Sequence, residues 1–121
     1  MNPQDGTAIE AHPYSDAVVA GGLVFVSGAL PLREDGVVVG GRIDALDAAI
    51  DTARRRLATV GARLEDVVKA TYYLTDITLR DEANAQFCRL WPAPRPARTV
   101  VEVSALPYSA VVEIDLVARV R

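Results

Sequence analysis

The sequence has few of the side chains on which most catalytic and metal sites depend. Its 121 residues include one cysteine, Cys88, and one histidine, His12. A single cysteine cannot form a disulfide within the chain, which fits a reducing cytoplasm. The two residues together cannot supply a cluster of nitrogen and sulfur ligands for zinc. We therefore expect no disulfide framework, no zinc centre, and no Ser-His-Asp or Cys-His triad unless His12 serves it.

Positive charge, aromatic rings and long apolar runs are also scarce. The formal net charge is −3 and aromatic residues make up 6% of the chain. Nucleic-acid binders hold phosphates with positive charge and stack bases on rings, so the composition disfavours a nucleic-acid partner. No apolar run approaches the roughly 20 residues of a membrane-spanning helix, and the N-terminus does not resemble a signal peptide. The sequence thus predicts a soluble, cytoplasmic protein that binds no membrane.

What the chain does contain suits one domain over residues 1–121. Half of its residues are hydrophobic, enough to bury a single core. Two apolar segments flank Gly21 and Gly22, which predicts a β-hairpin over residues 17–27. Residues 33–41 are rich in glycine and charge, and we expect a loop there that can include a short strand at residues 37–39.

A change of period follows this loop. Apolar residues recur at steps of three and four from Ile43 to Val60, which predicts a helix, and Gly61 suits its C-terminal cap. The basic triplet at residues 54–56 interrupts this pattern, and we interpret it as a solvated helix face rather than a binding patch.

The second half of the chain alternates strands with one more helix. Valine, threonine and tyrosine predict a strand over residues 67–75, and helical spacing predicts a helix over residues 79–90 that ends before three prolines. Two further strands are expected at about residues 98–103 and 111–119. This order predicts an α+β fold in which two helices cover one face of a mixed sheet.

The last strand indicates which residues face the helices. Its apolar positions alternate with Glu113, Asp115 and other residues, so Glu113 is expected to point away from the core. The second face then mixes valines with charges and has no helix to cover it. We therefore expect this face to pack against another subunit. The predicted core positions of this strand are Val112, Ile114, Leu116 and Ala118.

Few residues remain as candidates for chemistry. Lys69 is the only lysine, and its place in a strand favours a snorkelling or paired lysine over a Schiff base. Cys88 does not lie beside a cationic residue at a capped helix N-terminus, the setting that activates a thiol, so it is interpreted as an inert helix residue. Arg98 follows a proline-rich loop, and a guanidinium on such a stiff junction can hold a carboxylate with two parallel hydrogen bonds. Composition and spacing alone favour the alternative, a surface ion pair.

Three ordered blocks of residues change this balance. They are His12-Pro13-Tyr14-Ser15 with Gly22, Phe25, Ser27-Gly28 and Pro31; Asn84 with Phe87; and Pro96-Ala97-Arg98-Thr99 with Leu106-Pro107 and Val112-Glu113-Ile114. Together these blocks resemble the RidA (YjgF-type) family of reactive-intermediate deaminases. The resemblance implies a chorismate-mutase-like α+β fold and a homotrimer with clefts between its subunits. It also implies hydrolysis of enamines and imines of small carboxylates, such as 2-aminoacrylate, to 2-keto acids and ammonia without a cofactor.

The resemblance assigns roles to individual residues as well. It implies that Arg98 anchors the substrate carboxylate and that Glu113 orients or deprotonates the attacking water. Backbone groups around Thr99 and Val100 complete the cradle, and Tyr14 closes the pocket from the adjacent subunit and can pass a proton.

Two further residues of the family pattern, Ser27 and Asn84, shape or hydrogen-bond the cleft. Three of these assignments have alternatives. Tyr14 can be a packed rim residue, Asn84 can tie a helix to a loop, and Glu113 can form an interface ion pair with Lys69 or an arginine.

Several positions depart from the family pattern. Ala29 replaces a usual glutamine, Val100 a frequent cysteine, and the loop from Trp91 to Arg98 is shorter and carries Arg95. Tyr108 is a further addition beside the expected cleft, and Ala45 and Thr52 replace a glutamine and an asparagine of the first helix. The alternatives are thus a pathway-specific enzyme for another imine or small carboxylate, or a non-catalytic ligand-binding or chaperone-like protein. Endoribonuclease activity, reported for some relatives, is disfavoured by the acidic composition.

Overall fold

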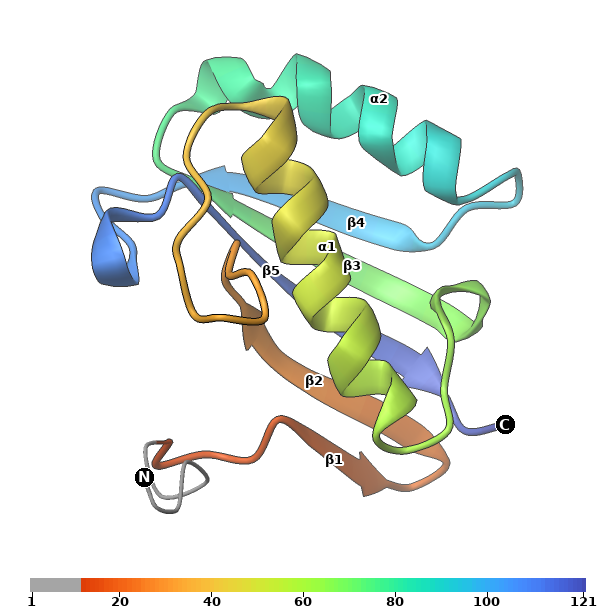
Figure 1. The fold of residues 1–121 in the computed structure, drawn as a ribbon. Coiled ribbons are helices and arrows are strands. Elements are labelled where there is room, and N and C mark those ends of the chain that lie inside the picture. Colours follow the sequence, from red (N-terminus) through yellow and green to blue (C-terminus); the bar gives the residue numbers. More distant parts are fainter. Residues whose placement is uncertain (1–11) are drawn as a thin grey trace.

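Five strands form one sheet in the computed structural model, which describes residues 12–121 (Figure 1). The first 11 residues of the predicted domain lie outside this range. The sheet order is β1-β2-β5-β3-β4; β3 and β4 are parallel and all other neighbours antiparallel, so the sheet is mixed as predicted. The strands are β1 (Ala17–Ala20), β2 (Leu23–Ala29), β3 (Val67–Leu74), β4 (Ala97–Glu102) and β5 (Val112–Arg119).

Both helices, α1 (Ile43–Ala58) and α2 (Arg80–Leu90), lie on the same face of the sheet, which confirms the prediction (Figure 1). Apolar spacing in α1 turns one stripe of side chains onto β2 and β5. Ile43 and Val60 belong to the predicted stripe but are exposed, because Ile43 opens the helix and Val60 follows its end. Gly61 has a φ of +76°, the left-handed conformation that a helix C-terminus favours.

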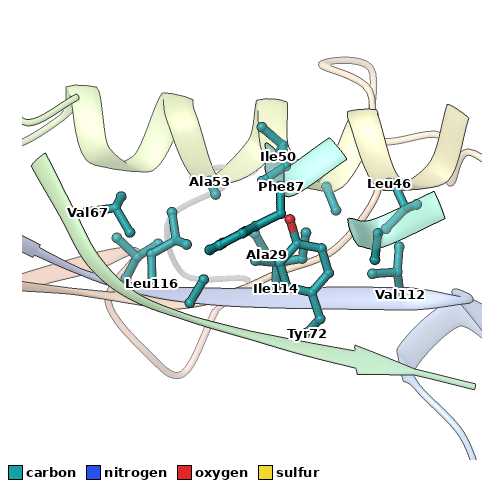
Figure 2. Close-up of a cluster of buried hydrophobic side chains, with 14 of the residues drawn as sticks. Ala29, Leu46, Ile50, Ala53, Val67, Tyr72, Phe87, Val112, Ile114 and Leu116 are labelled. Atoms are coloured by element: carbon teal, nitrogen blue, oxygen red, sulfur yellow. The ribbon is translucent and has the colours of Figure 1, made fainter. Parts of the chain in front are cut away.

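The core lies between the helices and the sheet, where Tyr72 and Phe87 lie near Ile114 (Figure 2). The Tyr72 hydroxyl donates a hydrogen bond of 2.9 Å to Oε1 of Gln86, so this buried polar group has a partner. The four apolar positions predicted for the last strand are all buried here, which confirms the alternation of β5: Val112, Ile114, Leu116 and Ala118.

No helix of residues 12–121 lies over the opposite face of the sheet (Figure 1). Val18 and Phe25, which are cross-strand partners, are exposed, and so is Val101 on the edge strand β4. Exposed apolar side chains on a sheet face are typical of a surface that another chain covers. The expected subunit contact stays a prediction, because the structure describes one copy of the chain.

The predicted loop between β2 and α1 holds only an isolated bridge between Leu32 and Val38. Pro31 accepts a backbone hydrogen bond from Val39, which folds this loop back on itself. No helix in residues 12–121 is long and apolar enough to span a bilayer.

Candidate functional site

The end of β2 is irregular and forms one wall of a cavity. The register of β2 against β5 shifts between Val26 and Ala29, as it does at a β-bulge. Arg56 on α1 holds this segment, because its Nη1 donates to the carbonyl oxygens of Ser27 and Gly28 at 3.0 Å each. Bulges redirect side chains and are common beside functional sites.

A cavity of about 690 Å³ opens at this bulge. Three of the predicted site residues line it: Tyr14, Ser27 and Glu113. Arg56 and Tyr108 line it as well. The cavity has the volume of sites that bind small molecules, about 300–1,000 Å³. The cavity therefore brings three of the seven predicted site residues together.

Glu113 points away from the core into this cavity, as predicted, and is half-buried. Its carboxylate lies against the backbone of Gly28 so closely that a Cβ on residue 28 would be 2.8 Å from the Glu113 Cδ. Burial raises the pKa of Glu113, the charge of Asp115 raises it further, and the positive charge of Arg56 lowers it. The net effect is a carboxyl group that binds a proton at higher pH than a free glutamate, which suits proton transfer.

Arg98 occupies a different environment, between β4 and α2. Its Nη2 donates to Oδ1 of Asn84 at 2.5 Å, and its guanidinium carbon lies 4.8 Å from the ring centroid of Phe87 and 5.6 Å from that of Tyr72. Burial lowers the pKa of Arg98, yet arginine stays charged at neutral pH. The Nη1 atom is buried and has no hydrogen-bond partner among the described residues. The side chain is thus held at one nitrogen and unsatisfied at the other.

Arg98 and Glu113 lie on opposite faces of the sheet. Ala70, a core residue, pairs with Arg98 on one side, which places Arg98 on the face that the helices cover. Tyr73 pairs with Glu113, and the strand alternation places both on the uncovered face. Residues paired across strands share a face, so one chain does not bring Arg98 and Glu113 together.

The other predicted residues divide between these two places. Asn84 ties α2 to β4 through Arg98, whereas Tyr14 and Ser27 lie at the cavity. Thr99 is exposed on the uncovered face and accepts a hydrogen bond of 2.8 Å from Nζ of Lys69. Lys69 thus has a hydrogen-bond partner on the neighbouring strand. Val100 points toward the helices and packs against the core.

Sequence reasoning missed one residue of the cavity, Arg56. The interpretation of the basic triplet as a solvated face holds for Arg54 and Arg55 but is wrong for Arg56, which is only 8% exposed. Its guanidinium also lies 5.8 Å from the ring centroid of Tyr14. The helical period could have predicted that Arg56 is buried, because residue 56 follows the buried Ala53 by three positions.

The departures from the family pattern differ in their relation to the cavity. Ala29 is fully buried in the core and does not line the cavity. Arg95 is exposed in the proline-rich loop and borders a separate groove. Tyr108 does line the cavity, with a φ of 59° that turns the backbone at this point.

The remaining candidates contribute little chemistry in the described part of the chain. His12 stacks on Tyr14 with ring centroids 4.9 Å apart and lines the cavity. Cys88 is exposed on α2. Among residues 12–121 there is no group of three or more histidine, cysteine or acidic residues that could hold a metal ion.

Comparisons with known proteins agree on one family. The family model described as Endoribonuclease L-PSP matches residues 6–120. The chain is 36% identical over 108 residues to a RutC family protein of Pyrococcus abyssi, covering 88% of this chain and 85% of that protein. It is 37% identical to the chloroplastic Reactive Intermediate Deaminase A of Arabidopsis thaliana, covering 88% of this chain and 58% of that protein. The crystal structure of RidA from an Antarctic Psychrobacter superposes with a TM-score of 0.84 at 32% identity, covering 89% of each chain.

Proposed function

The chain belongs to the family of RidA and of the proteins described as Endoribonuclease L-PSP, and we propose that it hydrolyses reactive imines and enamines of small carboxylates to 2-keto acids and ammonia. The relative named Reactive Intermediate Deaminase A supports the choice of reaction. The composition supports it over ribonuclease activity, because the chain is acidic and poor in the aromatic residues that stack bases.

The observation that carries the proposal is the unsatisfied guanidinium of Arg98. A buried N–H group without an acceptor costs about 1–3 kcal/mol, and more when it is charged. A substrate carboxylate would provide the missing acceptor and a counter-charge at once. Nη1 is buried in the single chain, so a carboxylate cannot reach it directly. The guanidinium must therefore turn slightly to bring Nη1 to the bound carboxylate. Asn84 and the Phe87 ring limit how far it can turn.

Glu113 supplies the acid–base group in this proposal. An enamine such as 2-aminoacrylate first tautomerises to the imine, taking a proton on its methylene carbon and giving one up from its nitrogen. Water then adds to the imine carbon, and Glu113 accepts the proton that the water loses. That proton passes to the nitrogen and gives a carbinolamine. The hydroxyl proton of the carbinolamine then moves to the amine as the carbon–nitrogen bond breaks, so that ammonia leaves the 2-keto acid. The imine is electrophilic by itself, so positioning and one proton carrier are sufficient.

Two copies of the chain are required for this site. Arg98 and Glu113 lie on opposite faces of one sheet, so the carboxylate anchor of one copy must meet the Glu113 cavity of another. The proposed assembly is a homotrimer with three such clefts. The exposed apolar side chains of the uncovered face support contact between copies.

The remaining residues have supporting roles in the proposal. Backbone groups near Thr99 and Val100 border the substrate, because β4 is an edge strand with one side unpaired. Tyr14 closes the cavity on the Glu113 side and relays protons, and Ser27 fixes the cavity wall through its hydrogen bond of 2.6 Å to the Ser15 carbonyl. Asn84 holds Arg98 in place.

The test is coupled turnover of 2-aminoacrylate that a second enzyme releases in situ. Wild-type protein should form pyruvate faster than the spontaneous reaction, and Arg98→Ala should return the rate to that background. Arg95→Ala is the matched control, because Arg95 is exposed in the same loop and borders a different groove. Equal rates for wild type and Arg98→Ala would refute the proposal, and tight binding of 2-keto acids without turnover would identify a binding protein instead.

A further inference from the structure

We infer that Arg56 makes the cavity selective for substrates with a second carboxylate, so that the preferred imines are those of dicarboxylic 2-keto acids. The inference rests on the proposed function and names the substrate class of the same site. It concerns a residue outside the proposed pair of Arg98 and Glu113.

The bonding of Arg56 leaves donors available in the cavity. Its Nη1 is used by the carbonyls of Ser27 and Gly28, and its Nε lies 3.5 Å from Oδ1 of Asp16. Among the described residues Nη2 has no hydrogen-bond partner, and it is not one of the buried atoms that lack one. Because Arg56 lines the cavity, we take Nη2 as the donor that a ligand in the cavity can reach.

The charge of Arg56 is incompletely balanced by the protein. The 3.5 Å between Nε of Arg56 and Oδ1 of Asp16 is long for a hydrogen-bonded ion pair. The Asp16 side chain is also 48% exposed, so solvent screens its charge. Glu113 takes up protons in the proposed reaction and cannot be a permanent counter-ion. The Arg56 side chain is only 10% exposed, so its charge needs a partner, and a ligand carboxylate fits the planar donors of a guanidinium.

The position of Arg56 suits the far end of a substrate. Arg98 of one copy holds the carboxylate beside the reacting carbon, and Glu113 of the neighbouring copy faces that carbon. Arg56 lies in the same cavity as Glu113. A side chain that extends from the reacting carbon into the cavity can therefore place its terminal group at Nη2 of Arg56.

A purely structural role explains less of this arrangement. Fixing the bulge carbonyls requires only neutral donors, whereas a buried positive charge adds a desolvation cost. The two bonds from Nη1 instead hold the guanidinium in a fixed orientation, so little ordering is needed when a carboxylate binds. Apolar residues dominate the rest of the wall, including Leu30, Leu32 and Val38, so one carboxylate fits this end better than a phosphate that needs several donors.

The experiment compares two product analogues of equal shape by calorimetry. 2-Oxoglutarate carries the second carboxylate, and 5-methyl-2-oxohexanoate replaces it with an uncharged isopropyl group. Wild type should bind 2-oxoglutarate about 10- to 100-fold more tightly than 5-methyl-2-oxohexanoate. This is the factor in affinity that a hydrogen bond to a charged group contributes. Arg56→Met should lower the affinity for 2-oxoglutarate much more than that for the uncharged acid, so that the preference is lost. The control is Arg54→Met, because Arg54 is exposed and pairs only with Asp51 among residues 12–121.

Three results would overturn the inference: no preference in wild type, a preference that survives Arg56→Met, or an equal loss of both affinities in that variant. If Arg56→Met fails to fold, the absence of a preference in wild type still overturns the inference. Binding is measured without turnover, so the two proposals fail separately. Hydrolysis of 2-aminoacrylate without a preference for the diacid would refute only the role of Arg56, and a preference without any turnover would refute only the proposed reaction.

Discussion

Gly28→Ala should disable the proposed site without unfolding the protein. A Cβ at this position would lie 2.8 Å from Cδ and 3.1 Å from Cγ of Glu113. Carbon atoms pack at about 3.5–4.0 Å, so the Glu113 carboxylate must retreat by about 0.7 Å or more. The φ of Gly28 is not in the left-handed region, so the backbone accepts alanine and the effect is steric alone.

The size of the effect follows from these distances. A displacement near 1 Å at a reacting group costs about 100-fold, so kcat/KM should fall by about 10- to 100-fold. The half-buried carboxylate can move, so overpacking should cost only about 1 kcal/mol of unfolding free energy, near the lower limit for such changes. That corresponds to a melting temperature about 4 °C lower.

The assay is imine turnover beside thermal unfolding. Gly40→Ala is the matched control, because a Cβ there meets no atom within 4 Å and its φ is also not left-handed. An unchanged rate in a folded Gly28→Ala protein would refute the reasoning, as would an equal loss of rate in Gly40→Ala.

Two further predictions concern stability. Because the folded state raises the pKa of Glu113, chiefly by burial, its ionisation opposes folding: wild type loses stability as the pH rises through that pKa. Glu113→Gln should therefore have a higher melting temperature than wild type at pH 7. The difference should vanish below about pH 4, where Glu113 is protonated in both the folded and the unfolded state. A difference in melting temperature that grows as the pH falls would contradict the expected direction of the effect. Arg98→Met loses the bond to Asn84 and the ring contacts but also removes the unsatisfied Nη1, so its unfolding free energy in denaturant should change by no more than about 1 kcal/mol. A loss of about 3 kcal/mol would show that Arg98 is structural.

Local patterns predicted the elements well because periodicity is a local property. The alternation in β5 was strong enough to place Glu113 on the face away from the core, and the structure confirms it. The spacing in α1 predicted its buried stripe but not its ends, since Ile43 and Val60 lie where the helix begins and after it has stopped. Helix ends depend on caps and loop geometry that spacing alone does not contain.

The face on which Arg98 lies could not be predicted in the same way. Val100 and Val101 are neighbours on β4 and face opposite sides, so this strand has no clean alternation of apolar and polar residues. The pairing register of β4 with β3 determines which face Arg98 lies on, and this register is a property of the assembled sheet. The separation of Arg98 from Glu113 within one chain became visible only with that register.

Arg56 shows how composition can conceal a site residue. Three consecutive arginines are typical of a solvated helix face, so all three were interpreted together. The position of Arg56 relative to the buried stripe of the helix was not weighed separately. The bulge that receives Arg56 is a tertiary feature of β2 and β5 and leaves no mark in the spacing of α1. Charged residues that fall in phase with a buried stripe therefore merit attention as site candidates.

The central claim is that Arg98 of one copy and Glu113 of another form each site, and subunit complementation tests it most directly. Arg98→Ala and Glu113→Gln, each inactive alone, are co-expressed in equal amounts so that mixed oligomers form. Each site then receives an intact Arg98 with a chance of about one half and an intact Glu113 with the same chance, so about one quarter of the wild-type rate should return. No activity above that of the separate variants, in oligomers shown by native mass spectrometry to be mixed, would contradict the account.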